Sequence, residues 1–145
     1  METQDHGSHP PRLRVLVVDD DSEVASSLGF LIEILGAKVA IALSAHTGAK
    51  VAEEFKPDIA FIDLEMPGAD GCKLLEMLHA PDCDCGTPVC VCLTSREGFR
   101  VEERCREAGF DGFVRKPLEV DALEFMLTEC RKRLEQTRQH IGHRH

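Results

Sequence analysis

The chain of 145 residues contains no tryptophan and no tyrosine, and it carries more acidic than basic side chains. Tryptophan and tyrosine are among the side chains that stack best on nucleic-acid bases. The 17 Lys and Arg against 26 Asp and Glu give a formal charge of −9. An acidic protein is repelled by phosphate backbones. We therefore expect no nucleic-acid partner.

Long hydrophobic runs are also missing, because no apolar stretch of the sequence approaches the roughly 20 residues needed to span a bilayer. Residues 1–12 are polar and show no apolar signal-peptide segment. We expect a cytoplasmic protein without a membrane partner. The length suits one domain with a core of its own and is short for two.

The seven cysteines are an odd count without signs of secretion, so a disulfide framework is not expected. Cys90 and Cys92 lie in an apolar run, where a reduced thiol acts as a small hydrophobe. Cys83 and Cys85 lie in a polar loop and are expected to be exposed. A zinc site built on these two, with His79 nearby, would need further ligands. Reduced thiols are the preferred interpretation, and metal binding by Cys83 and Cys85 stays open.

Five short apolar segments alternate with five segments of helical periodicity. The expected strands are 13–19, 37–42, 58–63, 88–93 and 112–115. The expected helices lie between Val24 and Gly36, over 44–55, 70–79 and 98–108, and from about 118 onwards. The first helix is expected to bury the stripe Val24, Leu28, Leu31 and Leu35, and the last one Val120, Leu123, Leu127, Cys130 and Leu134.

This (βα)₅ alternation predicts an α/β fold, a doubly wound five-stranded parallel sheet with helices on both faces. Residues 1–11 are expected to form a disordered N-terminal arm. Residues 12–135 are expected to form the domain, and residues 136–145 a basic, His-containing tail.

Polar side chains gather where the expected strands end. They are Asp19, Asp20, Asp63, Thr94, Ser95 and Lys116. Ligands of an open parallel sheet bind outside the carboxyl ends of its strands, at the topological switch point. A carboxylate is a competent nucleophile toward a phosphoryl group, and Mg²⁺ prefers oxygen ligands. The pattern therefore predicts a magnesium and phosphoryl site.

Each residue also has a simpler interpretation. Asp20 and Asp21 could cap the following helix, which is most plausible for Asp21. Thr94 could be a β-former only, Lys116 a solvated lysine and Asp63 a turn former. Unrelated causes would not bring all of them to neighbouring strand ends, so the site is the favoured interpretation.

Four segments resemble the receiver domain of response regulators. They are the run Val-Leu-Val-Val-Asp-Asp up to Asp20, the run Asp63-Leu-Glu-Met-Pro-Gly-Ala-Asp-Gly71, Leu93-Thr94-Ser95, and Gly112-Phe-Val-Arg-Lys-Pro117. The resemblance covers about residues 12–135. It implies a flavodoxin-like sheet of order 2-1-3-4-5 and a two-component phosphorelay protein. Such a protein could be a stand-alone, chemotaxis-regulator-like receiver or the receiver of a hybrid histidine kinase.

The resemblance also implies roles for the site residues. Asp63 is the expected phosphoacceptor. Asp20, Asp63 and the backbone carbonyl of Glu65 are the expected direct Mg²⁺ ligands, with Asp19 acting through water and Mn²⁺ as a substitute ion. The expected phosphoryl-binding and switch residues are Thr94, Ser95, Lys116 and Phe113. The peptide bond before Pro117 is expected to be cis.

Two further expectations concern the lifetime of the phosphorylated protein and the surface that contacts its downstream partner. Glu65 follows Asp63 by two residues, and Arg96 follows Thr94 by two residues. Because their charges are opposite, we hypothesise that they pair across the pocket mouth and hinder attack by water on the acyl phosphate. Two independent solvated side chains are the alternative. The output surface is expected on the fourth helix, fifth strand and last helix, with Phe99 and Phe125 as exposed apolar anchors.

We therefore expect a switch that accepts a phosphoryl group from a histidine kinase or phosphotransfer protein and acts on a downstream protein target. It would be no enzyme beyond its own phosphorylation and dephosphorylation. A phosphorylation-independent adaptor is the alternative. A phosphohydrolase of the D-x-D type is disfavoured by the sequence Asp63-Leu64-Glu65, and an FMN carrier by the lack of a phosphate loop after the first strand.

Overall fold

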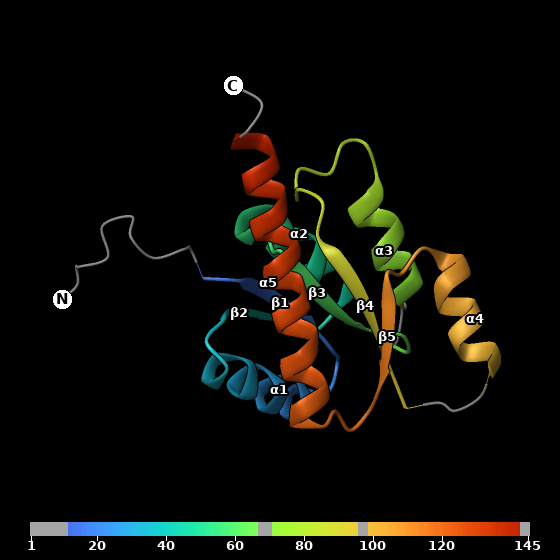
Figure 1. Ribbon diagram of the computed structural model, residues 1–145. Coiled ribbons are helices and arrows are strands. Elements are labelled where there is room, and N and C mark those ends of the chain that lie inside the picture. Colours follow the sequence, from blue (N-terminus) through green and yellow to red (C-terminus); the bar gives the residue numbers. More distant parts are fainter. Residues whose placement is uncertain (1–11, 67–70, 96–98, 143–145) are drawn as a thin grey trace.

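The protein is described by a computed structural model, which covers residues 12–66, 71–95 and 99–142. Five parallel strands form one sheet of order β2-β1-β3-β4-β5 (Figure 1), which confirms the predicted fold. The strands are β1 Arg14–Val18, β2 Lys38–Ala42, β3 Ile59–Asp63, β4 Val89–Thr94 and β5 Gly112–Arg115. The helices are α1 Ser22–Ile34, α2 Ala45–Phe55, α3 Gly71–His79, α4 Phe99–Ala108 and α5 Val120–Gly142.

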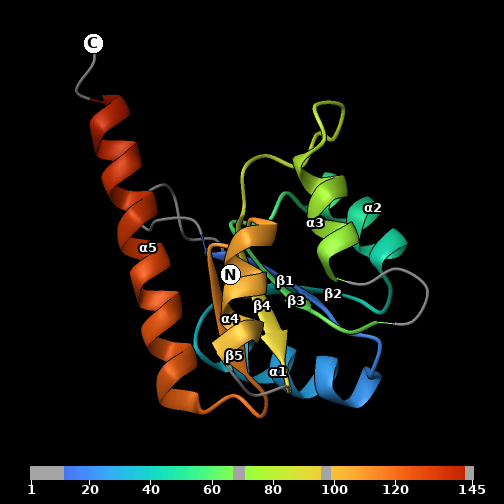
Figure 2. The same ribbon diagram turned by 90° about the vertical axis from the view of Figure 1, so that its right-hand side faces the viewer.

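The sheet is buried on both faces, as the apolar runs of its central strands require. Successive side chains of a strand point to opposite faces, so each central strand contributes to two clusters. One cluster joins Leu16, Ile62 and Cys92 to α2, α3 and α4. The other joins Val17 and Phe61 to α1 and α5. Figure 2 shows α5 on one side of the sheet and α2 and α3 on the other.

The buried face of α1 is rotated from the predicted one. Of the predicted stripe only Leu28 is buried, whereas Ala25 and Ile32 are buried as well. The other stripe residues, Val24, Leu31 and Leu35, are half-buried. Val120 was predicted to face the core from α5, but it is exposed because it begins the helix. Helical spacing identified the apolar side of α1 without showing which edge of that side the sheet covers.

Side chains cap the starts of α1 and α2, and the predicted cap at Asp21 is confirmed. The Asp21 side chain accepts hydrogen bonds from the backbone N–H groups of Glu23 and Val24 at the start of α1. Ser44 accepts one from the N–H of Thr47 at the start of α2. These bonds satisfy backbone donors that have no partner inside the helix.

The helix α5 is longer than the sheet it covers, and its C-terminal turns project beyond it (Figure 2). The expected domain boundary after residue 135 falls inside this helix, so the backbone has no break there. The Arg131 guanidinium donates to the Leu35 carbonyl at 3.0 Å, which joins α5 to the end of α1. Within the described ranges, none of the helices combines the length and the apolar character of a transmembrane helix.

The expected exposure of Cys85 was wrong. Cys85 is fully buried against the core beneath α3, with its sulfur 3.4 Å from the Leu78 carbonyl oxygen, and Cys83 is half-buried. Lys56 binds the Asp84 carbonyl and thereby holds the loop against the end of α2. Polar neighbours in the sequence suggested a solvated loop, but the loop turns Cys85 fully and Cys83 partly inward.

Candidate functional site

Three carboxylates meet at the carboxyl ends of β1 and β3. Asp19 and Asp20 directly follow β1, and Asp63 is the last residue of β3. Each offers an oxygen within 4.8 Å of the others, the one such cluster of acidic, histidine or cysteine donors found in the described ranges. Asp19 is 0% and Asp63 4% exposed, whereas Asp20 is exposed. The cluster thus has a buried base and an open side.

One ammonium group lies between the two buried carboxylates. Lys116, directly after β5, places Nζ 2.7 Å from Oδ2 of Asp19 and 3.2 Å from Oδ1 of Asp63. Two backbone N–H groups also donate to these carboxylates. The N–H of Asp21 donates to Asp19 at 3.0 Å, and that of Glu65 donates to Asp63 at 3.4 Å.

The pKa values of the site reflect burial and charge together. Burial and the neighbouring charge of Asp19 raise the pKa of Asp63 to about 6, although Lys116 opposes the shift. Burial alone would lower the pKa of Lys116, but its hydrogen bond to Asp19 and the charges of Asp63 and Asp19 raise it overall. The carboxylates therefore keep Lys116 charged, while one ammonium does not offset the crowding of acids.

The donor set fits a hard divalent cation. Three carboxylates and one ammonium leave a formal charge of −2 when all are ionised, and two like charges 4 Å apart repel by about 4 kcal/mol at an effective dielectric of 20. Mg²⁺ takes oxygen ligands, usually one or two carboxylates, and keeps several waters. Asp20 and Asp63 could hold it on the open side, where such waters have room.

Backbone contacts fix the turn that follows Asp63. The N–H of Leu64 donates to the Leu93 carbonyl at 2.8 Å, and the N–H of Gly71 donates to the Leu64 carbonyl at 3.0 Å. A Cβ atom at Gly71 would lie 2.5 Å from the carbonyl oxygen of Asp63. Only glycine lets the first turn of α3 approach the acid this closely. The sequence motif contained Gly71, but nothing in the spacing revealed this contact.

The hydroxyl residue and the lysine come from adjacent strands. Thr94 ends β4 and is fully buried, and the N–H of Lys116 donates to its carbonyl at 2.8 Å. Ser95 is exposed beside it. Phe113 on β5 is half-buried against the cluster that includes α4. The bond between Lys116 and Pro117 is cis, as predicted.

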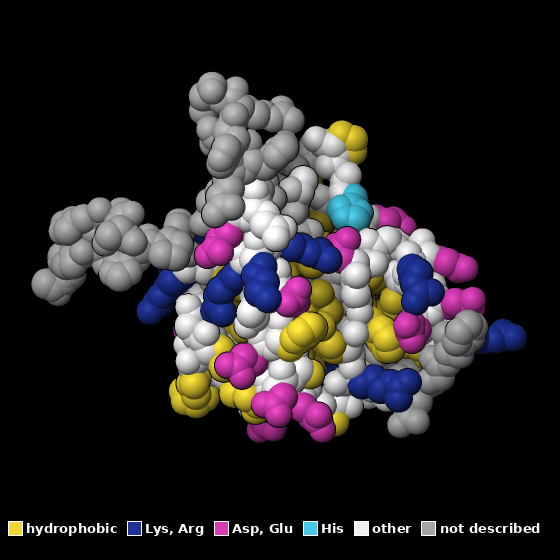
Figure 3. Space-filling view, in the orientation of Figure 1, with side chains coloured by type: hydrophobic (Ala, Val, Ile, Leu, Met, Phe, Trp, Pro, Cys, Tyr) yellow, Lys and Arg dark blue, Asp and Glu magenta, His cyan; other side chains and the backbone are white. Residues whose placement is uncertain are grey.

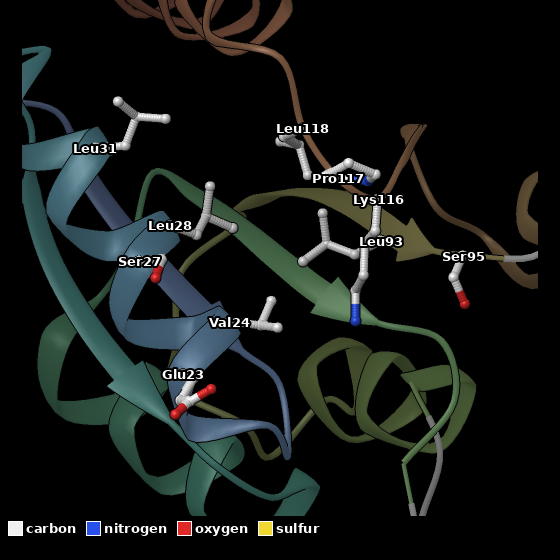
Figure 4. A pocket seen from close by; sticks show the side chains of 10 residues that line it. All are labelled: Glu23, Val24, Ser27, Leu28, Leu31, Leu93, Ser95, Lys116, Pro117 and Leu118. Atoms are coloured by element: carbon white, nitrogen blue, oxygen red, sulfur yellow. The ribbon is translucent and has the colours of Figure 1, made fainter.

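A groove of about 580 Å³ begins beside Lys116 and runs along α1. Ser95 and Lys116 lie at its end nearest the site (Figure 4). Its walls are largely apolar, and they include Val24, Leu28, Leu31, Leu93, Pro117 and Leu118. Three residues of the predicted core stripe of α1 thus line an open surface. Sequence analysis missed this groove because it assigned the whole stripe to the core.

The residues predicted to tune the lifetime and to form the output surface are only partly described by the structure. Arg96 lies outside the described residues, so its pairing with Glu65 stays a prediction. Phe99 begins α4, but its side chain is also outside the described part. Phe125 on α5 is 67% exposed, as expected of a surface anchor.

Comparison with known proteins agrees with this geometry. Residues 15–128 match the family model described as "Response regulator receiver domain". The transcriptional regulatory protein PrrA of Mycobacterium tuberculosis is 39% identical over 104 residues, covering 72% of this chain and 43% of that protein. The virulence sensor protein BvgS of Bordetella bronchiseptica is 33% identical over 125 residues, covering 83% of this chain and 10% of that protein.

Solved receiver domains share the fold. A CheY-like receiver domain protein from Methanospirillum hungatei has a TM-score of 0.73 at 26% identity, covering 87% of this chain and 99% of that one. The receiver domain of Francisella response regulator 1452 has a TM-score of 0.74 at 25% identity, covering 85% and 99%.

The five-stranded fold and the acid–lysine site define a two-component signalling module. The chain belongs to the response regulator receiver domain family, whose members typically accept a phosphoryl group. It spans less than half the length of the PrrA proteins it matches.

The raised pKa of Asp63 predicts how Asp63→Asn changes stability with pH. The ordinary value of 3.8 rises to about 6 in the fold, so the folded protein holds the proton more tightly and loses stability as pH rises through this window. Without divalent ions, Asp63→Asn should therefore be more stable than the wild type by roughly 1–3 kcal/mol above pH 7. The advantage should vanish below pH 4, where the carboxyl is protonated in both states.

Urea unfolding from pH 4 to pH 8 measures this difference. Mg²⁺ should then stabilise the wild type more than Asp63→Asn, because only the wild type retains the Asp63 carboxylate as a ligand. A stability difference that is constant across pH would contradict the assigned shift.

Gly71→Ala should destabilise the fold and disturb the site. Its methyl group would meet the Asp63 carbonyl oxygen at 2.5 Å, so the backbone must move. We expect a loss of about 1–3 kcal/mol in the free energy of unfolding, measured with urea. Gly112→Ala is the matched control, because no atom lies within 4 Å of a Cβ atom there. Equal effects of the two substitutions would show that the close approach is unimportant.

Proposed function

We propose that this chain is a Mg²⁺-dependent phosphorylation switch with Asp63 as the phosphoacceptor. The observation that carries the proposal is the position of Lys116 Nζ, between the buried carboxylates of Asp19 and Asp63, beside the exposed carboxylate of Asp20. The donor would be a histidine kinase or a phosphotransfer protein. The cytoplasmic location remains a prediction.

The chemistry follows from the arrangement of the Asp63 oxygens. Lys116 and the Glu65 N–H both contact Oδ1, so we assign Oδ2 as the nucleophile. Its bond to phosphorus forms as the bond from phosphorus to the donor nitrogen breaks, which leaves an acyl phosphate. Bound Mg²⁺ would supply positive charge that offsets the repulsion between the carboxylates and the phosphoryl oxygens. Asp20 and Asp63 would hold it directly, Glu65 through its carbonyl, and Asp19 through water.

Lys116 and the residues after β4 would then hold the phosphoryl group. The Lys116 ammonium can move its contact from Asp63 to a phosphoryl oxygen without leaving Asp19. The Thr94 hydroxyl and Ser95 lie at the end of the adjacent strand. Phosphorylation would bias a two-state equilibrium involving Thr94 and Phe113.

The groove along α1 is the surface that we assign to the phosphodonor. It opens beside Lys116, so a protein bound there can present a phosphohistidine to Asp63. Its apolar walls suit apolar side chains of the donor, which would gain affinity by burying them.

The output surface would lie on α4, β5 and α5. Phe125 is an exposed apolar residue on this side. Figure 3 shows apolar side chains among charges of both signs on this face. A mixed surface of this kind suits a reversible protein partner.

Acetyl phosphate with Mg²⁺ should add one phosphoryl group to the wild type, detected by intact mass, and none to Asp63→Asn. Lys116→Ala should reduce the rate at least about tenfold, because removing one preorganised charge from such a site costs this much or more. Asp82→Asn is the control, since Asp82 is an exposed acid in the loop after α3 and should be modified like the wild type.

If Asp63→Asn took up as much phosphoryl group as the wild type, Asp63 would not be the phosphoacceptor. If the wild type also failed to bind beryllofluoride in the presence of Mg²⁺, the adaptor alternative would be favoured.

The proposed pair of Glu65 and Arg96 can be tested through the lifetime of the phosphorylated protein. Arg96→Ala should shorten the lifetime about twofold to fivefold, the effect of losing an ion pair worth up to about 1 kcal/mol. Decay is followed by intact mass after the phosphodonor is removed. Arg100→Ala, which removes an exposed charge from α4, should leave the lifetime unchanged. An unchanged lifetime in Arg96→Ala would end the hypothesis.

A further inference from the structure

Two buried thiols meet between β4 and α4. The Sγ atoms of Cys92 and Cys105 are 3.0 Å apart, and the residues are 0% and 2% exposed. Bonded sulfurs are about 2 Å apart, so the two atoms need to approach by only about 1 Å. Cys92 and Cys105 are separated by 13 positions in the sequence, and neither takes part in the phosphoryl site described above.

Other buried thiols have different surroundings. The Cys85 sulfur faces the Leu78 carbonyl, and the Cys90 sulfur faces the Pro88 carbonyl. Cys90 is on the same strand as Cys92 and belongs to the same core cluster, so it provides a matched reference. The close approach of Cys92 to Cys105 is therefore a property of the pair and not of burial alone.

The position of Cys105 makes the pair important for α4. Among residues 100–108 of this helix, Cys105 alone is buried, and Val101 and Glu102 are half-buried. A helix that buries so little is a candidate for local opening. A covalent bond at Cys105 would act at the main point where the described part of α4 contacts the core.

We infer that Cys92 and Cys105 form a reversible disulfide that locks α4 against β4 under oxidising conditions. The two thiols would thus form a site that peroxides oxidise. Because the two sulfurs already face each other, the bond would require little rearrangement of the folded chain. The bond itself does not depend on Asp63 phosphorylation; its effect on output rests on the function proposed above.

The reaction balances with hydrogen peroxide as the oxidant. When α4 opens, the Cys105 sulfur attacks one peroxide oxygen, the O–O bond breaks, and a sulfenic acid and water form. The Cys92 sulfur then displaces the hydroxyl group of the sulfenic acid, giving the disulfide and a second water. Two thiols are oxidised and one peroxide is reduced. Cys105 lies on α4, the helix whose opening admits the peroxide, which places the first step at Cys105, while burial raises the pKa of the Cys92 thiol.

The experiment uses the full chain in a Cys83→Ala background, which removes a competing bond between Cys83 and Cys85 in the loop. After peroxide treatment and blocking of the remaining thiols, intact mass should show the loss of two hydrogens. Cys90→Ala should behave like the background protein. Cys92→Ala and Cys105→Ala should each lose at least about nine tenths of this product, because each lacks one partner.

A second measurement needs no additional variant. Amide hydrogen exchange of residues 99–108 should slow at least about tenfold after oxidation, because a disulfide across a short loop restricts opening. Dithiothreitol should restore the original rate. Cross-linking that persists in Cys92→Ala, no mass loss in the folded background protein, or unchanged exchange in the oxidised protein would each overturn the inference.

Discussion

The contact of Lys116 with Asp19 and Asp63 is the interaction on which the site depends. Two neighbouring buried carboxylates repel each other unless a positive charge lies nearby. Lys116 supplies this charge from the end of β5, which is two strands away from β3 in the sheet. The parallel arrangement matters because it brings three strand ends to the same edge. The charge is balanced only in part, because three carboxylates gather around one ammonium group. The remaining negative charge would attract a divalent cation, and the cation would offset the repulsion between the carboxylates and a phosphoryl group.

Strand β4 connects the site to the contact with α4. Thr94 ends β4 at the site, while Cys92, two residues earlier, points to the face that α4 covers. Because residues two apart on a strand share a face, a change at Thr94 would act on the side of β4 that contacts α4. The Lys116 N–H also binds the Thr94 carbonyl, so β4 and β5 would move together at this edge. If the proposed phosphorylation acts on the proposed output face, these few residues would provide a short path between them.

Features of the fold and the site that follow from the local sequence pattern could be predicted, whereas features that depend on contacts between distant segments could not. The strands and the acid–lysine cluster were predictable, because apolar runs identify strands and the ends of parallel strands must meet. Which edge of α1 is covered was not predictable, since 3.6-residue periodicity gives a side and not its boundaries. Gly71 stands in the motif, but its contact with the Asp63 carbonyl depends on the position of α3. The burial of Cys85 and the meeting of Cys92 with Cys105 likewise arise from packing between segments distant in the sequence.

The weak attachment of α4 is physically suited to a switch. Burying one aliphatic side chain contributes roughly 1.5–3 kcal/mol, and α3 buries Leu74, Leu75 and Leu78. The described part of α4 buries a single small thiol, Cys105. Coupling free energies between sites are typically about 1–3 kcal/mol, which is enough to reposition α4 but not α3. Phosphorylation at the sheet edge would therefore act on the helix that the core holds least firmly, and a disulfide at Cys105 would remove that freedom where it arises.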